Sequence, residues 1–158
     1  MESQLERRIP GREVRTYRMP HRANFTPTKT VARPAAYLVP QDLSRVIEKL
    51  QHHRIRLDRL TASRTFNGEI DRVRNVSKAP SPDVGSMTRE ETVISASREP
   101  GRITGRAGDV LVPTDQILGT LAVYLLEPES DDGLVRWGYL DDRIRAGEIL
   151  PISRIAGF

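Results

Sequence analysis

The chain has 158 residues, of which 37% are hydrophobic and 29% are charged, a composition typical of one globular domain rather than of a disordered segment. It contains no cysteine, which excludes disulfides, thiolate metal sites and thiol nucleophiles. No apolar run is long enough to span a bilayer and no secretion signal opens the chain, so we expect a soluble piece; an extracellular or periplasmic location stays open if a longer parent is exported.

The formal net charge of +4 is concentrated at the N-terminus. Residues 1–30 carry seven basic and three acidic side chains, which accounts for the whole net charge. Prolines at four places in residues 1–34 are too closely spaced for a long helix. We interpret 1–30 as a basic, proline-containing arm or linker, with a possible short strand at 13–19, and 31–158 as a single α/β domain. Because this domain is electrically neutral, a nucleic-acid-binding face is not expected, although the arm alone could bind polyanions weakly.

The first part of the predicted domain has the pattern strand, helix, strand. Residues 35–39 are an apolar run that ends at Pro40 and predict a buried strand. Apolar residues then recur at helical spacing within 41–53, and 55–60 predict a second strand. If the two strands are parallel, the connection between them is a right-handed crossover.

The middle of the chain predicts two exposed strands. Weak alternation of apolar and polar residues at 69–74 and at 91–95 indicates a hairpin-like pair. Between them, 78–86 is rich in proline, glycine and serine, and we expect a mobile loop that does not join the ladder.

The last third predicts a strand at 109–112, a helix whose apolar positions run from 117 to 126, a short helix at 130–140 and a final strand at 149–155. Thr114 or Asp115 is the expected N-cap of the first of these helices. The expected fold class is therefore α/β (α+β), with a small mixed sheet and two to three helices. Leu121→Ala and Leu125→Ala should each cost about 2–5 kcal/mol, because both lie on the apolar face of that helix.

The sequence offers no recognisable catalytic motif. The histidines are His21, His52 and His53, none is followed by a carboxylate at the third position, and two adjacent histidines on a helix point about 100° apart. For His52 and His53 we favour a simpler reading, in which they stabilise the C-terminal end of the predicted helix. No Gly-x-Ser-x-Gly elbow and no phosphate-binding glycine loop is present.

The segment 127–133 holds four carboxylates in seven positions. A calcium site or an acid/base pair is conceivable, but the spacing does not match an EF-hand loop. We favour a structural interpretation, in which Ser130 caps the following helix and Asp131 and Asp132 face its dipole. For Trp137 and Tyr139 we favour a place in the core, and a partner-facing position of Trp137 is the alternative.

Part of the chain resembles a known family. The stretch 108–141, with 33–40 upstream, is similar to the C-terminal region of bacterial carboxypeptidase-A-like zinc peptidases. That region has a Val-Pro-x-x-Gln segment before an aliphatic helix, then Leu-Leu-Glu-Pro-x-Ser-x-Asp, and then Trp-Gly and an aromatic residue. The pattern is met here at Val112, Pro113, Gln116, Leu125, Leu126, Glu127, Pro128, Ser130, Asp132, Trp137, Gly138 and Tyr139.

The resemblance implies membership without activity. In family members the zinc ligands, the arginine for the substrate carboxylate and the general-base glutamate lie in a catalytic domain that precedes this region. We therefore expect no enzyme activity and no cofactor in this chain, with zinc belonging to the catalytic domain of a suspected metallocarboxypeptidase parent. The candidate ligand or interface residues are Gln116, Glu127, Ser130, Asp131, Asp132 and Trp137.

Three functions follow from these expectations. The first is an accessory domain that packs on or orients a peptidase catalytic domain, in cis or in trans. The second is a module that binds a peptide or cell-wall polymer at the loop ends after Pro40 and Pro113, where α/β sheets place ligands. The third is polyanion binding by the arm.

Overall fold

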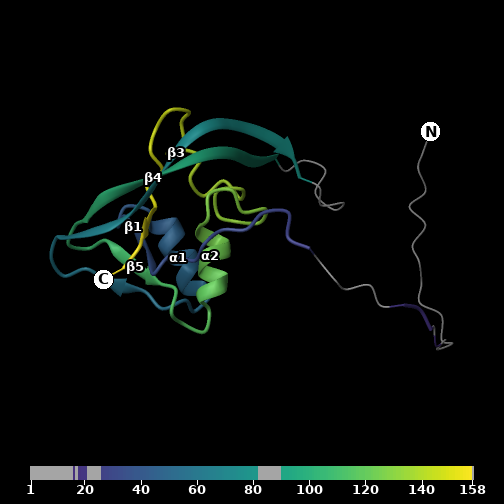
Figure 1. Ribbon diagram of the computed structural model, residues 1–158, viewed down its shortest axis with the longest axis horizontal. Helices are drawn as coiled ribbons and strands as arrows, with labels where there is room; N and C mark the ends of the chain where they lie inside the picture. The colour runs from purple at the N-terminus through teal and green to yellow at the C-terminus, as the bar shows by residue number, and fades with distance from the viewer. Residues whose placement is uncertain (1–15, 17, 21–25, 82–89, 158) are drawn as a thin grey trace. The chain divides into compact units, whose positions relative to one another are not determined.

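The computed structural model describes residues 16, 18–20, 26–81 and 90–157 (Figure 1). The chain divides into two units, Met1–Val31 and Ala32–Phe158, and the fold below is that of the second unit. The predicted strand at 13–19 falls largely outside the described residues, and the assignment of 1–30 as an arm stays a prediction. Among the described residues, no helix is both long and apolar enough to cross a membrane.

The second unit is built on one six-stranded sheet, which confirms the expected α+β fold class. Its strands are β1 (Ala36–Val39), β2 (Asp58–Arg59), β3 (Arg64–Pro80), β4 (Glu90–Gly105), β5 (Val110–Pro113) and β6 (Ser153–Ile155). They are ordered β2-β5-β1-β6-β3-β4, and the neighbours pair antiparallel, so the sheet is antiparallel rather than mixed. Both β1 and β2 run antiparallel to β5, which lies between them. The two strands of the predicted strand–helix–strand unit, β1 and β2, therefore run in the same direction but are not neighbours.

Two helices accompany the sheet. The predicted first helix is confirmed as α1 (Ser44–His52), while the second, α2 (Gly119–Leu126), begins later than expected. Thr114 and Asp115 are not its N-cap, because their side chains bind elsewhere. The Thr114 hydroxyl donates to the carbonyl of Pro34 at 2.5 Å, and Asp115 accepts a hydrogen bond from Arg56 at 2.9 Å. Leu118 occupies the N-cap position with no side-chain hydrogen bond.

Apolar side chains cover both faces of the central strands. Alternate residues of a strand point to opposite faces. Tyr37 and Val39 of β1 belong to the larger core cluster, which includes the apolar faces of α1 and α2, whereas Ala36 and Leu38 belong to a smaller cluster with Phe66 of β3. Burial on both faces explains why β1 and β5 are continuous apolar runs in the sequence.

The exposed strand pair is far longer than the sequence indicates. β3 and β4 pair from Arg64 with Gly105 to Pro80 with Glu90, with an irregularity between Val73 and Asn75 (Figure 1). The expected loop at 78–86 is therefore wrong at its start, because residues 78–80 pair with 90–92; residues 82–86 lie outside the described residues. Pro100 is accommodated because β4 is the edge strand of the sheet.

The segment after α2 does not form the predicted helix. Residues 128–143 are a series of turns, so neither Ser130 nor its acidic neighbours begin a helix. The predicted strands at 55–60 and 149–155 shrink to the two residues of β2 and the three of β6, and Ile149 forms an isolated bridge with Arg72. Tertiary packing replaces regular backbone pairing here, since Leu134, Val135, Leu140 and Leu150 are all buried.

Candidate functional site

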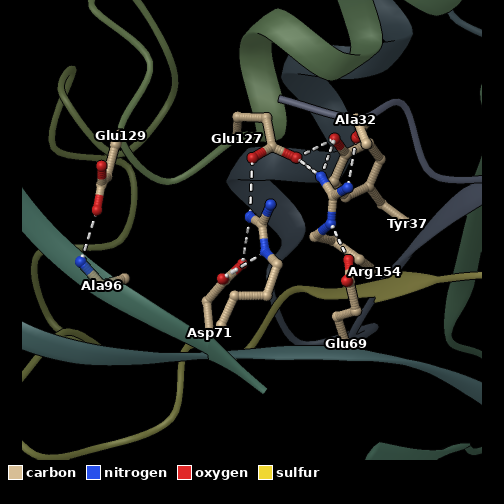
Figure 2. Close-up of polar contacts among 9 residues, drawn as sticks. Ala32, Tyr37, Glu69, Asp71, Ala96, Glu127, Glu129 and Arg154 are labelled. Carbon is tan, nitrogen blue, oxygen red and sulfur yellow. Dashed lines mark hydrogen bonds and ion pairs between the residues drawn. The ribbon is translucent and has the colours of Figure 1, made fainter. Parts of the chain in front are cut away.

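Glu127 lies at the centre of a buried network of charged side chains (Figure 2). Glu127 follows the last residue of α2 and is only 8% exposed. One carboxylate oxygen accepts hydrogen bonds from the guanidinium of Arg154 and, at 2.5 Å, from the hydroxyl of Tyr37. Arg154, in the middle of β6, is 4% exposed. Its other nitrogens donate to Glu69 at 2.8 Å and to the carbonyl of Ala32 at 2.5 Å.

A second arginine connects the network to the long hairpin. Arg98 of β4 forms a bidentate pair with Asp71 of β3, at 2.9 and 3.0 Å, and donates to the second carboxylate oxygen of Glu127 at 2.9 Å. Burial alone would lower the pKa of Arg98, but its hydrogen bonds to the two carboxylates raise it above the ordinary value. The network thus ties the end of α2 to β1, β3, β4 and β6 through charge-assisted hydrogen bonds.

The protonation state of Tyr37 is fixed by its surroundings. Burial, followed by the hydrogen bond to Glu127, raises the pKa of Tyr37 well above its ordinary value. The phenol therefore stays a neutral donor at ordinary pH, and both carboxylate oxygens of Glu127 are taken by donors of this chain. This arrangement holds the backbone elements that carry these side chains in fixed positions.

Three of the six candidate residues come together on the surface with Tyr124. The Tyr124 hydroxyl donates to Asp131 at 2.7 Å, and the Trp137 ring nitrogen donates to Asp132 at 2.5 Å. Tyr124 is 43% exposed and Trp137 is 47% exposed, so the favoured place of Trp137 in the core is wrong. The hydrogen bond to Asp131 is the main reason why the pKa of Tyr124 rises to about 12. We call these four residues the aromatic–acidic patch.

The other candidates make different contacts and are not part of this patch. Gln116 accepts a hydrogen bond from the backbone N–H of Arg56 at 2.7 Å and donates to the carbonyls of Arg56 and Pro113, which fixes the loop after β5. The hydroxyl of Ser130 is buried and finds no hydrogen-bond partner within the described part of the chain. Its neighbour Glu129 accepts a hydrogen bond from the backbone N–H of Ala96 in β4 at 2.7 Å.

A second polar cluster joins the hairpin to the turns after α2. Asp141 accepts hydrogen bonds at 2.5 Å from Lys78 and from the hydroxyl of Thr92. Burial alone would raise the pKa of Asp141, but these two bonds outweigh burial and lower the pKa below its ordinary value of 3.8. A carboxylate whose pKa falls on folding stabilises the folded state above the unfolded-state pKa, and this contribution is lost as the pH falls through the folded-state pKa.

We therefore expect Asp141→Asn to flatten the acid limb of the stability curve. The variant lacks the group whose protonation costs stability below pH 3.8, so its loss of stability between neutral pH and about pH 3 should be smaller than that of the unmodified chain. Urea denaturation at the two pH values measures this difference. The same acid loss in both proteins would contradict the role of Asp141.

Comparison with known proteins reveals relatives that are carboxypeptidases by name. The chain is 29% identical over 136 residues to Carboxypeptidase 2 of Trichophyton tonsurans and of Trichophyton equinum, covering 84% of this chain and 24% of each relative. Carboxypeptidase 2 of Trichophyton rubrum is 29% identical over 131 residues, which is 82% of this chain and 23% of the relative. No family model and no solved structure matches the chain.

The match covers only part of each relative. The chain spans about a quarter of the length of the curated relatives it matches. These relatives are fungal, so the bacterial origin and the C-terminal placement implied by the resemblance stay predictions. Among the described residues no group of three or more histidine and acidic side chains could hold a metal ion. His52 lies exposed, 3.9 Å from Glu48 across one helical turn.

Sequence reasoning missed most of the buried network. It singled out Glu127 but none of the partners Asp71, Arg98 and Arg154. A signal for Arg154 is present, since an arginine close to Ile152 and Ile155 in a short apolar segment requires an opposite charge nearby if the segment is buried. Nothing in the sequence indicates which of the acidic residues is that partner, because the contact between 127 and 154 depends on the sheet order.

Proposed function

We propose that this chain is a non-catalytic accessory region of a carboxypeptidase-like protein, where it packs on or orients the peptidase domain in cis or in trans. The observation that carries the proposal is the coverage of the sequence match, which is most of this chain but about a quarter of each relative. The catalytic machinery of the parent, including any zinc, would then lie in its unmatched part, with this region at the C-terminal end.

The aromatic–acidic patch supports a docking role. Tryptophan and tyrosine are enriched among the residues that dominate protein interfaces, because each combines a large apolar surface with a polar group. Here hydrogen bonds to Asp132 and Asp131 hold both polar groups while the rings stay half exposed. Side chains ordered in this way lose little conformational entropy when a partner covers them.

The proposal predicts that the chain alone is inactive. Purified protein with added zinc should not hydrolyse a peptide from its C-terminus, and elemental analysis after chelator dialysis should find well under one zinc per chain. A catalytic zinc needs about three protein ligands around an open position. Stoichiometric zinc together with turnover lost on mutating His52 or His53 would refute the non-catalytic assignment.

The accessory role itself is tested in a relative. Carboxypeptidase 2 of Trichophyton rubrum should be compared whole and without the segment that matches this chain. We expect the shortened protein to have a lower melting temperature and less carboxypeptidase activity, because it lacks a packed neighbour. Unchanged melting temperature and activity would rule out packing on or orienting the peptidase domain. The control is the same relative with an exposed loop deleted outside the matching segment, which should keep its melting temperature and its activity.

A second candidate function is a module that binds a peptide or cell-wall polymer. It is favoured by a surface groove beside residues 114–118, at the loop end that follows Pro113.

A further inference from the structure

Three arginines converge on this groove, which has a volume of about 1310 Å³. Arg33 comes from the segment before β1, and Arg54 and Arg56 come from the connection between α1 and β2. The loop after β5, including Asp115, Gln116 and Ile117, also lines the groove. Cavities that hold small organic ligands have volumes of roughly 300–1,000 Å³, so the groove could hold a short segment of polypeptide.

The positive charge of the groove is only partly compensated. Asp115 forms an ion pair with Arg56 at 2.9 Å. Within the described part of the chain, no carboxylate pairs with Arg33 or Arg54. A Cβ added at Gly119 would collide with a guanidinium nitrogen of Arg33, so this arginine rests against the first residue of α2. The first turn of α2 holds no acidic side chain to neutralise the positive end of the helix dipole.

Arg54 occupies a backbone position that favours glycine. Its φ angle is +59°, the left-handed region. The amide of Ile55 bonds to the carbonyl of Leu50 and the amide of Arg54 bonds to that of Gln51, the two hydrogen bonds of a Schellman motif at the end of α1. In this motif the residue at the position of Arg54 is usually glycine, because a side chain is disfavoured in the left-handed region. An arginine held against this preference, and aimed at a groove, points to a role for its side chain.

The other lining residues favour a polypeptide over a nucleic acid. Ile117 is fully exposed, and Pro34, Ala35 and Leu118 extend the apolar wall. Among the residues that the structure describes, no aromatic side chain on which a base could stack lines the groove. Guanidinium groups beside an apolar wall match a segment in which carboxylates alternate with aliphatic side chains.

We propose that the groove binds an acidic polypeptide segment, with Arg33 and Arg54 pairing with its carboxylates and Ile117 contacting an aliphatic side chain. The proposal names the ligand class of the second candidate function and does not rest on the accessory role. The test measures peptide binding rather than hydrolysis. The groove can therefore fail to bind an acidic peptide while the accessory role is correct, and it can bind one while the accessory role is wrong.

Fluorescence anisotropy with a labelled short peptide of alternating glutamate and leucine tests the proposal. We expect saturable binding that weakens with added salt, because the paired groups are exposed to solvent. Arg54→Gly should raise the Kd about tenfold, since it removes one charge-assisted pair. The same substitution suits the left-handed backbone, so the variant should unfold at no lower a urea concentration than the unmodified chain. If Arg54 had only a structural role, its substitution would not weaken peptide binding while leaving the stability to urea intact.

The controls separate the alternatives. Arg74→Gln removes one exposed arginine of β3 outside the groove and should leave the Kd unchanged; an equal loss there would reduce the binding to general charge attraction. A peptide with glutamine in place of glutamate should not bind. Equal or tighter binding of inorganic phosphate or of oligo(dT), or no binding of the acidic peptide, would overturn the proposal.

Discussion

Glu127→Gln is expected to lower the free energy of unfolding by about 3–5 kcal/mol, because it leaves two arginines without a shared counter-charge. Arg154 is 4% exposed and the side chain of Arg98 is 28% exposed, so water cannot fully replace the lost carboxylate. The substitution keeps the shape of the side chain. Its amide nitrogen, however, would face donors from Arg154, Arg98 or Tyr37.

Urea denaturation at neutral pH measures this effect. The matched control is Glu99→Gln, which removes one exposed carboxylate of β4 and should change the free energy of unfolding by less than about 0.5 kcal/mol. Similar small losses in both variants would mean that the network around Glu127 contributes little to stability. A change in the denaturant slope of Glu127→Gln would show that the substitution alters the compactness of the native or denatured state or breaks two-state unfolding.

Leu125→Ala is expected to cost about 2–5 kcal/mol, because the leucine is buried in the larger core cluster and its removal leaves a cavity. Leu125 also accepts the backbone hydrogen bond of Leu134 at 2.9 Å, so the turns after α2 cannot easily close the gap. Leu121 is only partly buried, and Leu121→Ala should cost about 1 kcal/mol, less than the helical pattern predicts.

The comparison of these two leucine variants tests the orientation of α2 in chemical denaturation. Ile117→Ala, at a fully exposed position just before the helix, is the control and should be near neutral. Equal costs for Leu121→Ala and Leu125→Ala would contradict the burial of α2 described above.

Local sequence patterns predicted the fold class, whereas the lengths of the hairpin strands and the structure after α2 depend on contacts between distant segments. The apolar run at 35–39 and the helical spacing in 41–53 gave β1 and α1 because each element has one dominant period. The hairpin was underestimated because Gly101 and Pro100 interrupt its alternation, which an edge strand tolerates. The helix predicted at 130–140 failed because its apolar residues are buried from successive turns rather than from one helical face.

The candidate site shows the same division. The sequence singled out the acidic residues at 127–133 as a group, and the structure separates them: Glu127 is buried among arginines, while Asp131 and Asp132 hold surface aromatic rings. The sequence does not predict the groove that is lined by Arg33, Arg54 and Arg56, because these arginines come from two segments that meet only in the folded protein. The backbone strain at Arg54 likewise has no sequence signature, as arginine is ordinary at a helix end.

The way β4 is covered bears on self-association. An edge strand of 16 residues presents free N–H groups on its outer side and invites a strand from another molecule. Here the outward N–H of Thr92 donates to the carbonyl of Arg136 at 3.1 Å, that of Ala96 donates to Glu129, and Pro100, in the same alternate row, has none. A strand from another molecule would therefore find no continuous row of backbone donors between Thr92 and Pro100, which is one of the ways in which a long edge strand is protected from pairing.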